Sequence, residues 1–440
     1  MILAYWKFAI AHSIPTLPMK TILFLTLASL SCLAQQPSSY LLQPDRVFDG
    51  EQMRTGVSVF VQNDKIVAVG PTNGIKASSG VTVVKLPGCT LLPGLIEGHS
   101  HLLLHPYNET SWDDQLLKES DAYRVARATV HAKNTLMAGF TTVRDLGTEG
   151  AGYADVGLKK AINDGIIPGP RMLVAGRAIV ATGSYGPKGF DNDFHVMIGA
   201  EEADGNNLVR VVRDQIGNGA DFIKVYADYR WGVNGEAQPT FSLDELKLIV
   251  ETAKSSGRPV VAHAVTEEAM RRATMAGVKT IEHGDLGTLE IFQLMKEKGV
   301  GYCPTLGAVD AIATYQGWQR GSLPEPPRIK AKRASYQAAI QAECVIITGG
   351  DVGVFPHGDN VREMELMMEY GMMADKVLRS ATSVNADFFG IGDRVGRIKE
   401  NMLADILVVQ GDPTKNIKDL RKVRLVMKDG VVVRNEEAVK

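Results

Sequence analysis

The 440-residue sequence contains few cysteines, and its charges nearly cancel. The four cysteines are scattered, and loss of an N-terminal segment containing Cys32 would leave three, which argues against a disulfide framework. The formal net charge of −2 and the lack of a basic cluster with interleaved aromatic residues argue against a nucleic-acid partner. Phosphate-binding and dinucleotide-binding glycine patterns are also missing, so nucleotide-dependent classes are not indicated.

Long apolar runs are scarce as well, and the run at residues 22–33 is too short to cross a bilayer. Lys20 precedes it, and Cys32 and Ala34 supply small residues at positions −3 and −1 of a cleavage site before Gln35. We therefore expect residues 1–34 to be a signal peptide, with Met19 as an alternative true start, and the mature protein to be exported to the periplasm or secreted. An uncleaved interfacial anchor is the other interpretation, whereas cleavage would leave no segment for stable membrane insertion.

Short β-branched runs occur near both ends of the chain. They lie at residues 57–61, 65–69 and 81–85, and again at residues 404–409, 423–428 and 431–434. Turn residues separate neighbouring runs, as in hairpins. Neither piece is large enough to bury a core alone, so we predict one small β-sandwich built from residues 35–92 and 399–440.

Strand-like and helix-like segments alternate between these ends. We expect strands at residues 95–96, 141–144, 172–175, 222–226, 260–263, 280–283, 300–303 and 345–348. Helices are expected at residues 121–137, 155–163, 208–216, 266–275, 288–298 and 328–342, with another beginning at Ser242, where Glu245 completes a capping box. Eight such units predict an α/β fold, a (β/α)8 TIM barrel over residues 93–398.

The most specific pattern is the pair His99 and His101, which follows an apolar run. Side chains two residues apart on a strand point the same way, so both imidazoles can bind one cation. Four later strands each end in one more candidate ligand, at the face where such barrels carry their active sites. The candidate metal ligands are His99, His101, Lys224, His263, His283 and Asp351.

Imidazoles and a carboxylate suit Zn²⁺ or a similar divalent ion, which would lower the pKa of a bound water to about 7. Asp351 could bind the ion and accept a proton from that water. Lys224 is unusual, because an ammonium group beside cations is strongly disfavoured. Carboxylation of its neutral amine by CO2 would reverse the charge and give a carbamate that bridges two metal ions.

This set of residues over eight β/α units resembles the amidohydrolase superfamily of binuclear type, over nearly the whole chain after the signal. The resemblance implies that His99, His101 and Asp351 bind one metal ion, that His263 and His283 bind the other, and that carboxylated Lys224 bridges them. The segments GLIEGHSHLLLHPYNETSWDDQ, AGFTTVRDLGTEG, GADFIKVYADYRWG and TIEHGD further resemble the imidazolonepropionase and prolidase branch. Its members with a bridging lysine include Xaa-Pro and other Xaa-Xaa dipeptidases.

We therefore expect a metal-dependent hydrolase of peptide or amide bonds, most simply a dipeptidase in which a metal-bridging hydroxide attacks the carbonyl carbon and Asp351 transfers the proton. A lactonase, or an ester or carbamate hydrolase, could use the same site. A metal-binding protein without catalysis is the alternative from another class. The expected partner is a small molecule, a dipeptide or an N-acyl amino acid, and self-association into a homo-oligomer is compatible with the sequence.

Candidates for holding the substrate are Tyr226, Tyr229 and Arg230, with Lys188 and Arg177 as further cations for a carboxylate. Loops at residues 181–193 and 322–327 are expected to lie over the site. Three other histidines are interpreted as non-ligands, namely His105, His131 on a helix surface, and His195 in a loop. Arg144 and Asp145 are interpreted as a structural ion pair, and the remaining cysteines as buried thiols.

Overall fold

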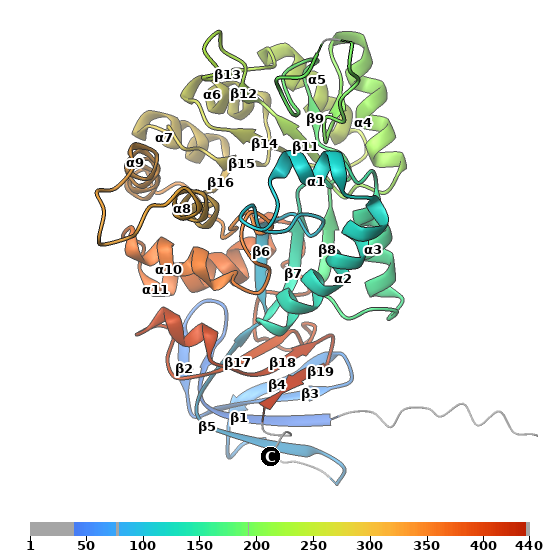
Figure 1. The fold of residues 1–440 in the computed structure, drawn as a ribbon. Coiled ribbons are helices and arrows are strands. Elements are labelled where there is room, and N and C mark those ends of the chain that lie inside the picture. Colours follow the sequence, from blue (N-terminus) through green and yellow to red (C-terminus); the bar gives the residue numbers. More distant parts are fainter. Residues whose placement is uncertain (1–38, 76–78, 192, 437–440) are drawn as a thin grey trace, which may run out of the picture. The chain divides into compact units, whose positions relative to one another are not determined.

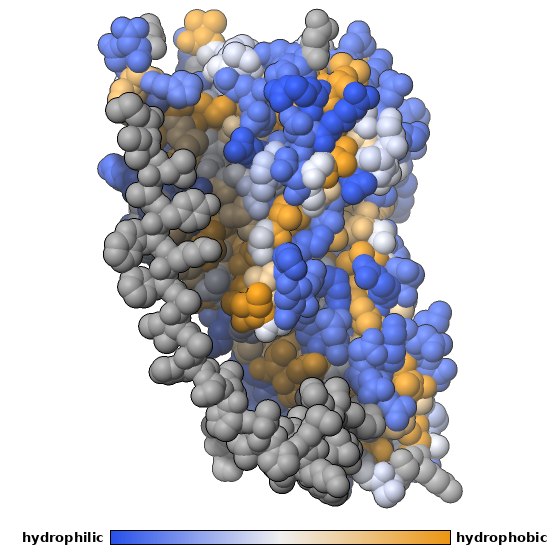
Figure 2. All heavy atoms as spheres, turned by 90° about the vertical axis from the view of Figure 1, so that its right-hand side faces the viewer, coloured by the Kyte–Doolittle hydropathy of each residue, from blue (hydrophilic) through white to orange (hydrophobic). Residues whose placement is uncertain are grey.

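The computed structural model describes residues 39–75, 79–191 and 193–436. The predicted signal peptide and the alternative start at Met19 lie outside the described residues. Within the described ranges, no helix is both long and apolar enough to span a bilayer. Figure 2 shows hydrophilic residues over much of one face of the molecule, with apolar residues between them.

Strands from both ends of the chain form one eight-stranded sheet, in the order β19-β18-β17-β5-β1-β3-β4, with β2 paired to β1. The two ends meet where β17 pairs antiparallel with β5, which brings the blue and red strands side by side (Figure 1). The strands are β1 (Ser39–Phe48), β2 (Met53–Thr55), β3 (Val57–Gln62), β4 (Lys65–Pro71), β5 (Thr82–Pro93), β17 (Ile406–Gln410), β18 (Val423–Lys428) and β19 (Val431–Asn435).

The hairpin predicted around residues 62–64 is confirmed, because Gln62 pairs with Lys65 and Asn63 has a left-handed φ of 55°. The strand β1 was not predicted, and β5 is longer than expected. The side of β1 that faces inward carries Leu42 and Val47, which pack in a core with residues of β3, β5 and β17. Division of this sheet into a two-layer sandwich, and the proposed domain boundaries, stay predictions.

Parallel strands and surrounding helices make up the middle of the chain, so the fold is α/β (Figure 1). One parallel sheet has the order β6-β7-β8 and another β10-β9-β11-β14-β15-β16, and isolated bridges join Ser100 to Val352 and Tyr302 to Ile346. The strands are β6 (Leu95–Ser100), β7 (Phe140–Asp145), β8 (Arg171–Val174), β9 (Ile179–Val180), β10 (Glu201–Glu202), β11 (Ile223–Tyr226), β14 (Val260–Ala264), β15 (Thr280–His283) and β16 (Gly301–Cys303). A short hairpin pairs β12 (Asp228–Arg230) with β13 (Ala237–Pro239).

Two differences from the predicted strands follow from these pairings. The strand expected at residues 345–348 is reduced to a single bridge at Ile346. The predicted closed barrel is observed as two parallel sheets with isolated bridges, so closure into one eight-stranded barrel stays a prediction.

The helices carry the start and stop signals that the sequence indicated. Ser242 and Glu245 form the expected capping box of α5, and Gly277 ends α6 with a left-handed φ of 90°. The helices are α1 (Trp112–Lys118), α2 (Asp121–Met137), α3 (Ala154–Asn163), α4 (Leu208–Gly217), α5 (Leu243–Lys254), α6 (Glu267–Ala276), α7 (Leu289–Lys298), α8 (Leu306–Tyr315), α9 (Pro327–Gln341), α10 (Val361–Glu369), α11 (Ala374–Arg379) and α12 (Asn385–Phe388). Shorter 3-10 turns lie at Gly205–Asn207 and Ile417–Arg421, and a π-helical turn at Ser380–Val384.

The terminal sheet packs against the parallel strands through a shared apolar core. Phe48 and Leu407 of that sheet belong to the same cluster of buried residues as Leu136 and Phe140. Gly139 makes the close approach feasible, because a Cβ atom there would lie 2.7 Å from Leu407 Cδ1 and its φ is 96°. The first residues of β6 and β7, Leu95 and Phe140, thereby pack against the terminal sheet, and His99 and His101 lie at the opposite end of β6.

Candidate active site

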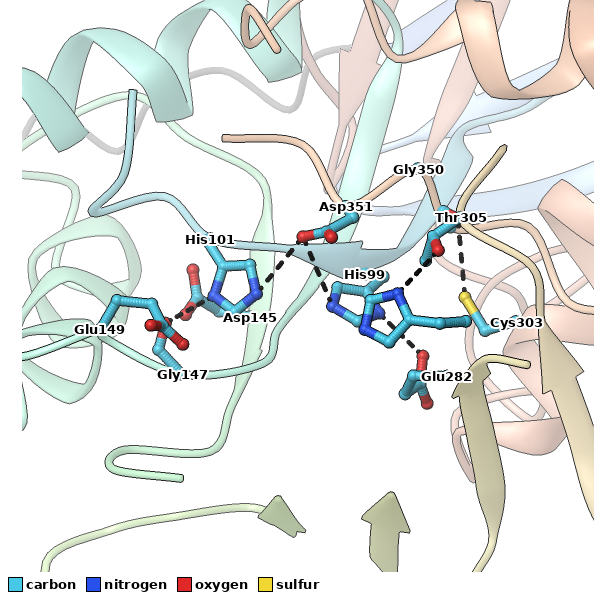
Figure 3. A network of polar contacts seen from close by, with 12 residues as sticks. His99, His101, Asp145, Gly147, Glu149, Glu282, Cys303, Thr305, Gly350 and Asp351 are labelled. Carbon is cyan, nitrogen blue, oxygen red and sulfur yellow. Dashed lines mark hydrogen bonds and ion pairs between the residues drawn. The ribbon is translucent and has the colours of Figure 1, made fainter. Parts of the chain in front are cut away.

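The histidine pair lies at the end of β6, in the buried interior. The exposed fraction of His99 is 0% and that of His101 is 5%. The Nε2 atoms of both rings face Asp351, whose Oδ1 lies 3.6 Å from His99 and 3.5 Å from His101 (Figure 3). Asp351 has a left-handed φ of 62° and follows Gly349, where a Cβ atom would lie 2.7 Å from the His99 nitrogen. The glycine therefore lets the Asp351 segment lie directly against β6.

The two later histidines extend this group. His263 on β14 and His283 at the end of β15 have ring centroids 4.4 Å apart, and the rings of His283 and His99 are 5.1 Å apart. Ligand atoms of His99, His283 and Asp351 all lie within 4.8 Å of one another. Three segments that are far apart in the sequence thus bring donor atoms to one point.

Lys224 lies on β11, whose four residues are all buried, and belongs to the same group. Its exposed fraction is 1%, and its Nζ lies 5.1 Å from the ring centroid of Tyr226. Burial lowers the pKa of Lys224, although the carboxylates of Glu282 and Asp351 oppose that shift. Burial lies behind the low pKa of His99 and of His263 too, and the charge of Lys224 adds to it in both. The structure therefore brings all six predicted ligands together and favours neutral nitrogen donors.

Three polar atoms of this group are buried without a hydrogen-bond partner among the described residues: His99 Nε2, Lys224 Nζ and His263 Nδ1. Buried polar atoms are almost always paired, so these orphaned atoms require a further partner. Neutral imidazoles, an amine and the Asp351 carboxylate form a donor set that suits divalent metal ions. The residues present therefore fit a metal centre.

The ring nitrogens that point away from the group are held by fixed acceptors. Glu282 Oε2 lies 2.9 Å from His99 Nδ1, the Gly147 carbonyl oxygen lies 2.8 Å from His101 Nδ1, and Thr305 Oγ1 lies 2.9 Å from His283 Nδ1 (Figure 3). A carboxylate or carbonyl at one nitrogen fixes the tautomer and leaves the other nitrogen free to bind. Sequence reasoning missed Glu282, although an acidic residue inside the buried run TIEH was a usable signal.

Arg144 and Asp145 do not form the ion pair with each other that the sequence suggested. Arg144 donates to Glu282 Oε1 at 2.8 Å, whereas the carboxylate of Asp145 accepts from the Leu102 backbone nitrogen at 2.7 Å. The reason is geometric, because successive residues of a strand point to opposite faces. Arg144 thereby supports the carboxylate that orients His99.

A cavity of about 720 Å³ opens beside the ligand group. Its wall is rich in aromatic side chains, and it includes the three predicted substrate residues Tyr226, Tyr229 and Arg230. Arg230 is exposed and donates to the Tyr229 hydroxyl at 3.3 Å. The charged residues in the wall that sequence reasoning did not single out are Asp113, Glu149, Asp285 and Arg328.

Two other predicted cations lie away from this cavity. Lys188 donates to the Gly183 carbonyl at 2.8 Å, and Arg177 pairs with Glu201 at 2.8 Å. Of the predicted covering loops, the segment at residues 181–193 contributes Tyr185 to the cavity wall. The second loop precedes Arg328, the first side chain of α9 to reach the cavity.

The prediction that His131 lies on a helix surface is wrong. Its exposed fraction is 8%, its Nδ1 lies 2.9 Å from the Leu102 carbonyl oxygen, and its ring stacks on His357 with centroids 4.4 Å apart. Polar neighbours on α2 concealed the inward direction of this side chain. His105 contacts Glu119 at 2.9 Å and His195 is exposed. The three described cysteines, Cys89, Cys303 and Cys344, are buried, as expected.

Comparison with known proteins adds to this geometry. The model of the amidohydrolase family matches residues 90–433. Ochratoxinase of Aspergillus niger is 32% identical over 414 residues, which cover 86% of this chain and 82% of that protein. A crystal structure of a Xaa-Pro dipeptidase with methionine bound in its active site superposes with a TM-score of 0.80 at 31% identity, over 90% of this chain and 100% of the other. A prolidase in complex with N-methylphosphonate-L-proline gives a TM-score of 0.78 at 27% identity, over 91% of this chain and 100% of the other.

Proposed function

This chain belongs to the amidohydrolase family, and from that premise we propose that it is an exported, metal-dependent dipeptidase that cleaves Xaa-Pro or other Xaa-Xaa bonds. It is a hydrolase that acts on amide or peptide bonds. The observation that carries the dipeptidase proposal is the convergence of four imidazoles, one buried lysine and one carboxylate beside a cavity of about 720 Å³. The similarity to a Xaa-Pro dipeptidase supports it.

The proposed centre holds two divalent ions, with Zn²⁺ as the first choice. His99, His101 and Asp351 would hold one ion, and His263 and His283 the other. Lys224 would bridge them as a carbamate, and its lowered pKa supports this role because only the neutral amine reacts with CO2. When bound, such ions polarise a carbonyl and make hydroxide available at neutral pH.

The side chains then have separate tasks. Burial raises the pKa of Asp351 above its usual value, which suits a carboxylate that takes a proton and passes it to the leaving nitrogen. Tyr229 and Arg230 at the cavity wall would bind the C-terminal carboxylate of a dipeptide. The aromatic wall would exclude water from the reacting bond.

A dipeptide library tests this proposal directly. The full chain, loaded with zinc, should hydrolyse dipeptides with a free C-terminal carboxylate and should reject the same peptides as C-terminal amides. Metal analysis should give about two ions per chain. Hydrolysis of uncharged lactones with no activity across the library would refute the dipeptidase assignment, and one ion per chain would refute the binuclear centre.

Export is tested separately from activity. Expression of the full chain in a bacterial host should yield a mature protein in the periplasm or medium whose N-terminus is Gln35. Retention of residues 1–34 on the protein would refute cleavage at this site.

A further inference from the structure

Glu149 is a buried carboxylate in the cavity wall that the proposed mechanism does not use. It follows β7, its exposed fraction is 3%, and it lines the same cavity as Asp351. Its backbone has a left-handed φ of 49°, a conformation that glycine adopts more easily. Figure 3 shows Glu149 beside His101 and Gly147.

The carboxylate of Glu149 is surrounded by neutral donors. Trp112 Nε1 donates to Oε2 at 3.0 Å, the Tyr185 hydroxyl donates to Oε2 at 2.7 Å, and the Tyr226 hydroxyl donates to Oε1 at 3.2 Å. Burial and the charge of Glu149 keep the pKa of both tyrosines well above the usual value, so their hydroxyls remain protonated donors. These three bonds hold the carboxylate in one orientation in the cavity wall.

A direct cationic partner for this carboxylate is missing in the part of the chain that the structure describes. Arg124 is buried behind the segment, but it donates to the backbone carbonyl oxygens of Thr148 and Glu149, at 2.9 Å and 2.7 Å. The carboxylate oxygens therefore keep acceptor capacity toward the cavity. A buried charge without a cation next to it is costly unless a ligand supplies one.

We propose that Glu149 binds the free α-ammonium group of the substrate and so makes the enzyme select an unblocked N-terminus. This inference rests on the proposed dipeptidase function. The α-nitrogen of a dipeptide is attached to the carbon next to the scissile carbonyl, so its site must lie close to the ligand group. Glu149 meets this requirement, because it lines the same cavity as Asp351 and accepts a hydrogen bond from Tyr226, whose ring stacks on that of His263 with centroids 4.6 Å apart.

The same geometry assigns the substrate's two ends to different parts of the wall. A carboxylate placed at the Tyr226 hydroxyl would meet the charge of Glu149 and be repelled. Tyr226 therefore belongs to the ammonium site, whereas Arg230 and Tyr229 remain for the C-terminal carboxylate. Of the two substrate types expected from the sequence, the dipeptide is favoured over the N-acyl amino acid.

Matched substrates test the proposal with the zinc-loaded full chain. Ala-Pro and Ala-Leu each have a counterpart that lacks only the amino group, propanoyl-Pro and propanoyl-Leu. Wild-type kcat/KM should favour the dipeptide of a pair by about 10²-fold, the usual size for a buried charge pair. The variant Glu149→Gln should reduce that ratio to less than about tenfold, because kcat/KM should fall for the dipeptide and stay unchanged for its counterpart. As a control, Glu290→Gln makes the same substitution at a side chain that is 74% exposed and outside the cavity wall, and it should retain the preference.

Each outcome separates the two proposals. If the wild type cleaves neither member of a pair, the dipeptidase assignment fails. If it cleaves both members equally well, or if Glu149→Gln slows both by the same factor, the ammonium site is refuted. A pH profile of the wild type tests the same proposal without any variant. The value of kcat/KM for Ala-Pro should fall above a pH of about 8, where the α-amine loses its proton, whereas kcat/KM for propanoyl-Pro should not fall there.

Discussion

The variant Glu282→Gln tests whether metal binding depends on the residue that orients His99. Glu282 has an exposed fraction of 0% and lies between His99 Nδ1, at 2.9 Å, and Arg144, at 2.8 Å. A third contact comes from the Thr280 hydroxyl. With the carboxylate present, Nδ1 of His99 carries the proton and Nε2 keeps the lone pair that points to Asp351. A glutamine that keeps its oxygen toward Arg144 presents its NH2 group to Nδ1, which favours the opposite tautomer.

Two effects of different size follow. Loss of the orienting contact should weaken metal binding about 10-fold to 100-fold, or roughly 1.4–2.8 kcal/mol. Arg144 has an exposed fraction of 3% and would lose its anionic partner, which lowers the free energy of unfolding by about 3 kcal/mol, the lower end for a broken buried pair, because the amide oxygen still accepts. The stability loss should be present without metal, whereas the affinity loss is measured with it.

The assay is a competition between the protein and a chelator of known affinity, followed by denaturant unfolding of the metal-free protein. Glu290→Gln is the matched control, because the side chain of Glu290 is 74% exposed and its contact to Arg271 at 3.2 Å is a surface ion pair. It should change stability by less than about 1 kcal/mol and leave metal binding unchanged. Wild-type metal affinity in a folded Glu282→Gln protein would refute the orienting role.

Three further predictions concern single residues. Lys224→Ala should lose metal and activity and recover part of both with a short carboxylic acid, whereas wild-type turnover in Lys224→Arg would rule out the carbamate, since a guanidinium stays cationic. Asp351→Asn should lower kcat by about 10²–10⁴-fold with metal largely retained, and near-normal turnover would remove Asp351 from proton transfer. Burial lowers the pKa of His131 from 6.5 to about 4. Its neutral ring therefore contributes about 3 kcal/mol to the free energy of unfolding above pH 6.5, and this contribution is lost as the pH falls toward 4. His131→Gln should flatten the unfolding free energy over that window, and an unchanged slope would contradict this.

The sequence predicted the convergence of the six candidate ligands because their signals are local. Each follows a short apolar run, and ends of parallel strands meet at one edge of a sheet. The i, i+2 rule placed His99 and His101 on the same side without knowledge of any distant contact. Helix ends with clear caps, such as the start of α5 and both ends of α6, were likewise predicted to within one or two residues.

Elements without periodic patterns were missed. Seven of the ten residues of α8 are buried, so LGAVDAIATY has no continuous polar face to give it a helical period. The strand β1 contains Pro44 and Asp45, which interrupt the alternation expected of a strand. Both elements are determined by what packs against them, and that information lies elsewhere in the chain.

Contacts between distant segments were equally beyond sequence reasoning. Glu282 is 183 residues from His99, and Glu149 receives its hydrogen bonds from α1, from the loop at Tyr185 and from β11. The burial of His131 depends on the path of the chain after His101, which the helix pattern of α2 does not contain. Orientation of a side chain is therefore the part of a site that one sequence specifies least.

The choice of ring nitrogen shows how the fold determines the chemistry. His99, His101 and His283 each have Nδ1 against an acceptor, which leaves Nε2 as the donor toward the centre. His263 is reversed, because its Nε2 lies 3.5 Å from Asp228 Oδ1 and its Nδ1 is buried without a partner among the described residues. Asp228 is itself fixed by the Val265 and Thr266 backbone nitrogens, so its carboxylate cannot turn away from that ring. Contacts outside the centre therefore occupy one ring nitrogen of each imidazole and leave the other free. The same contacts orient the free nitrogen for metal binding.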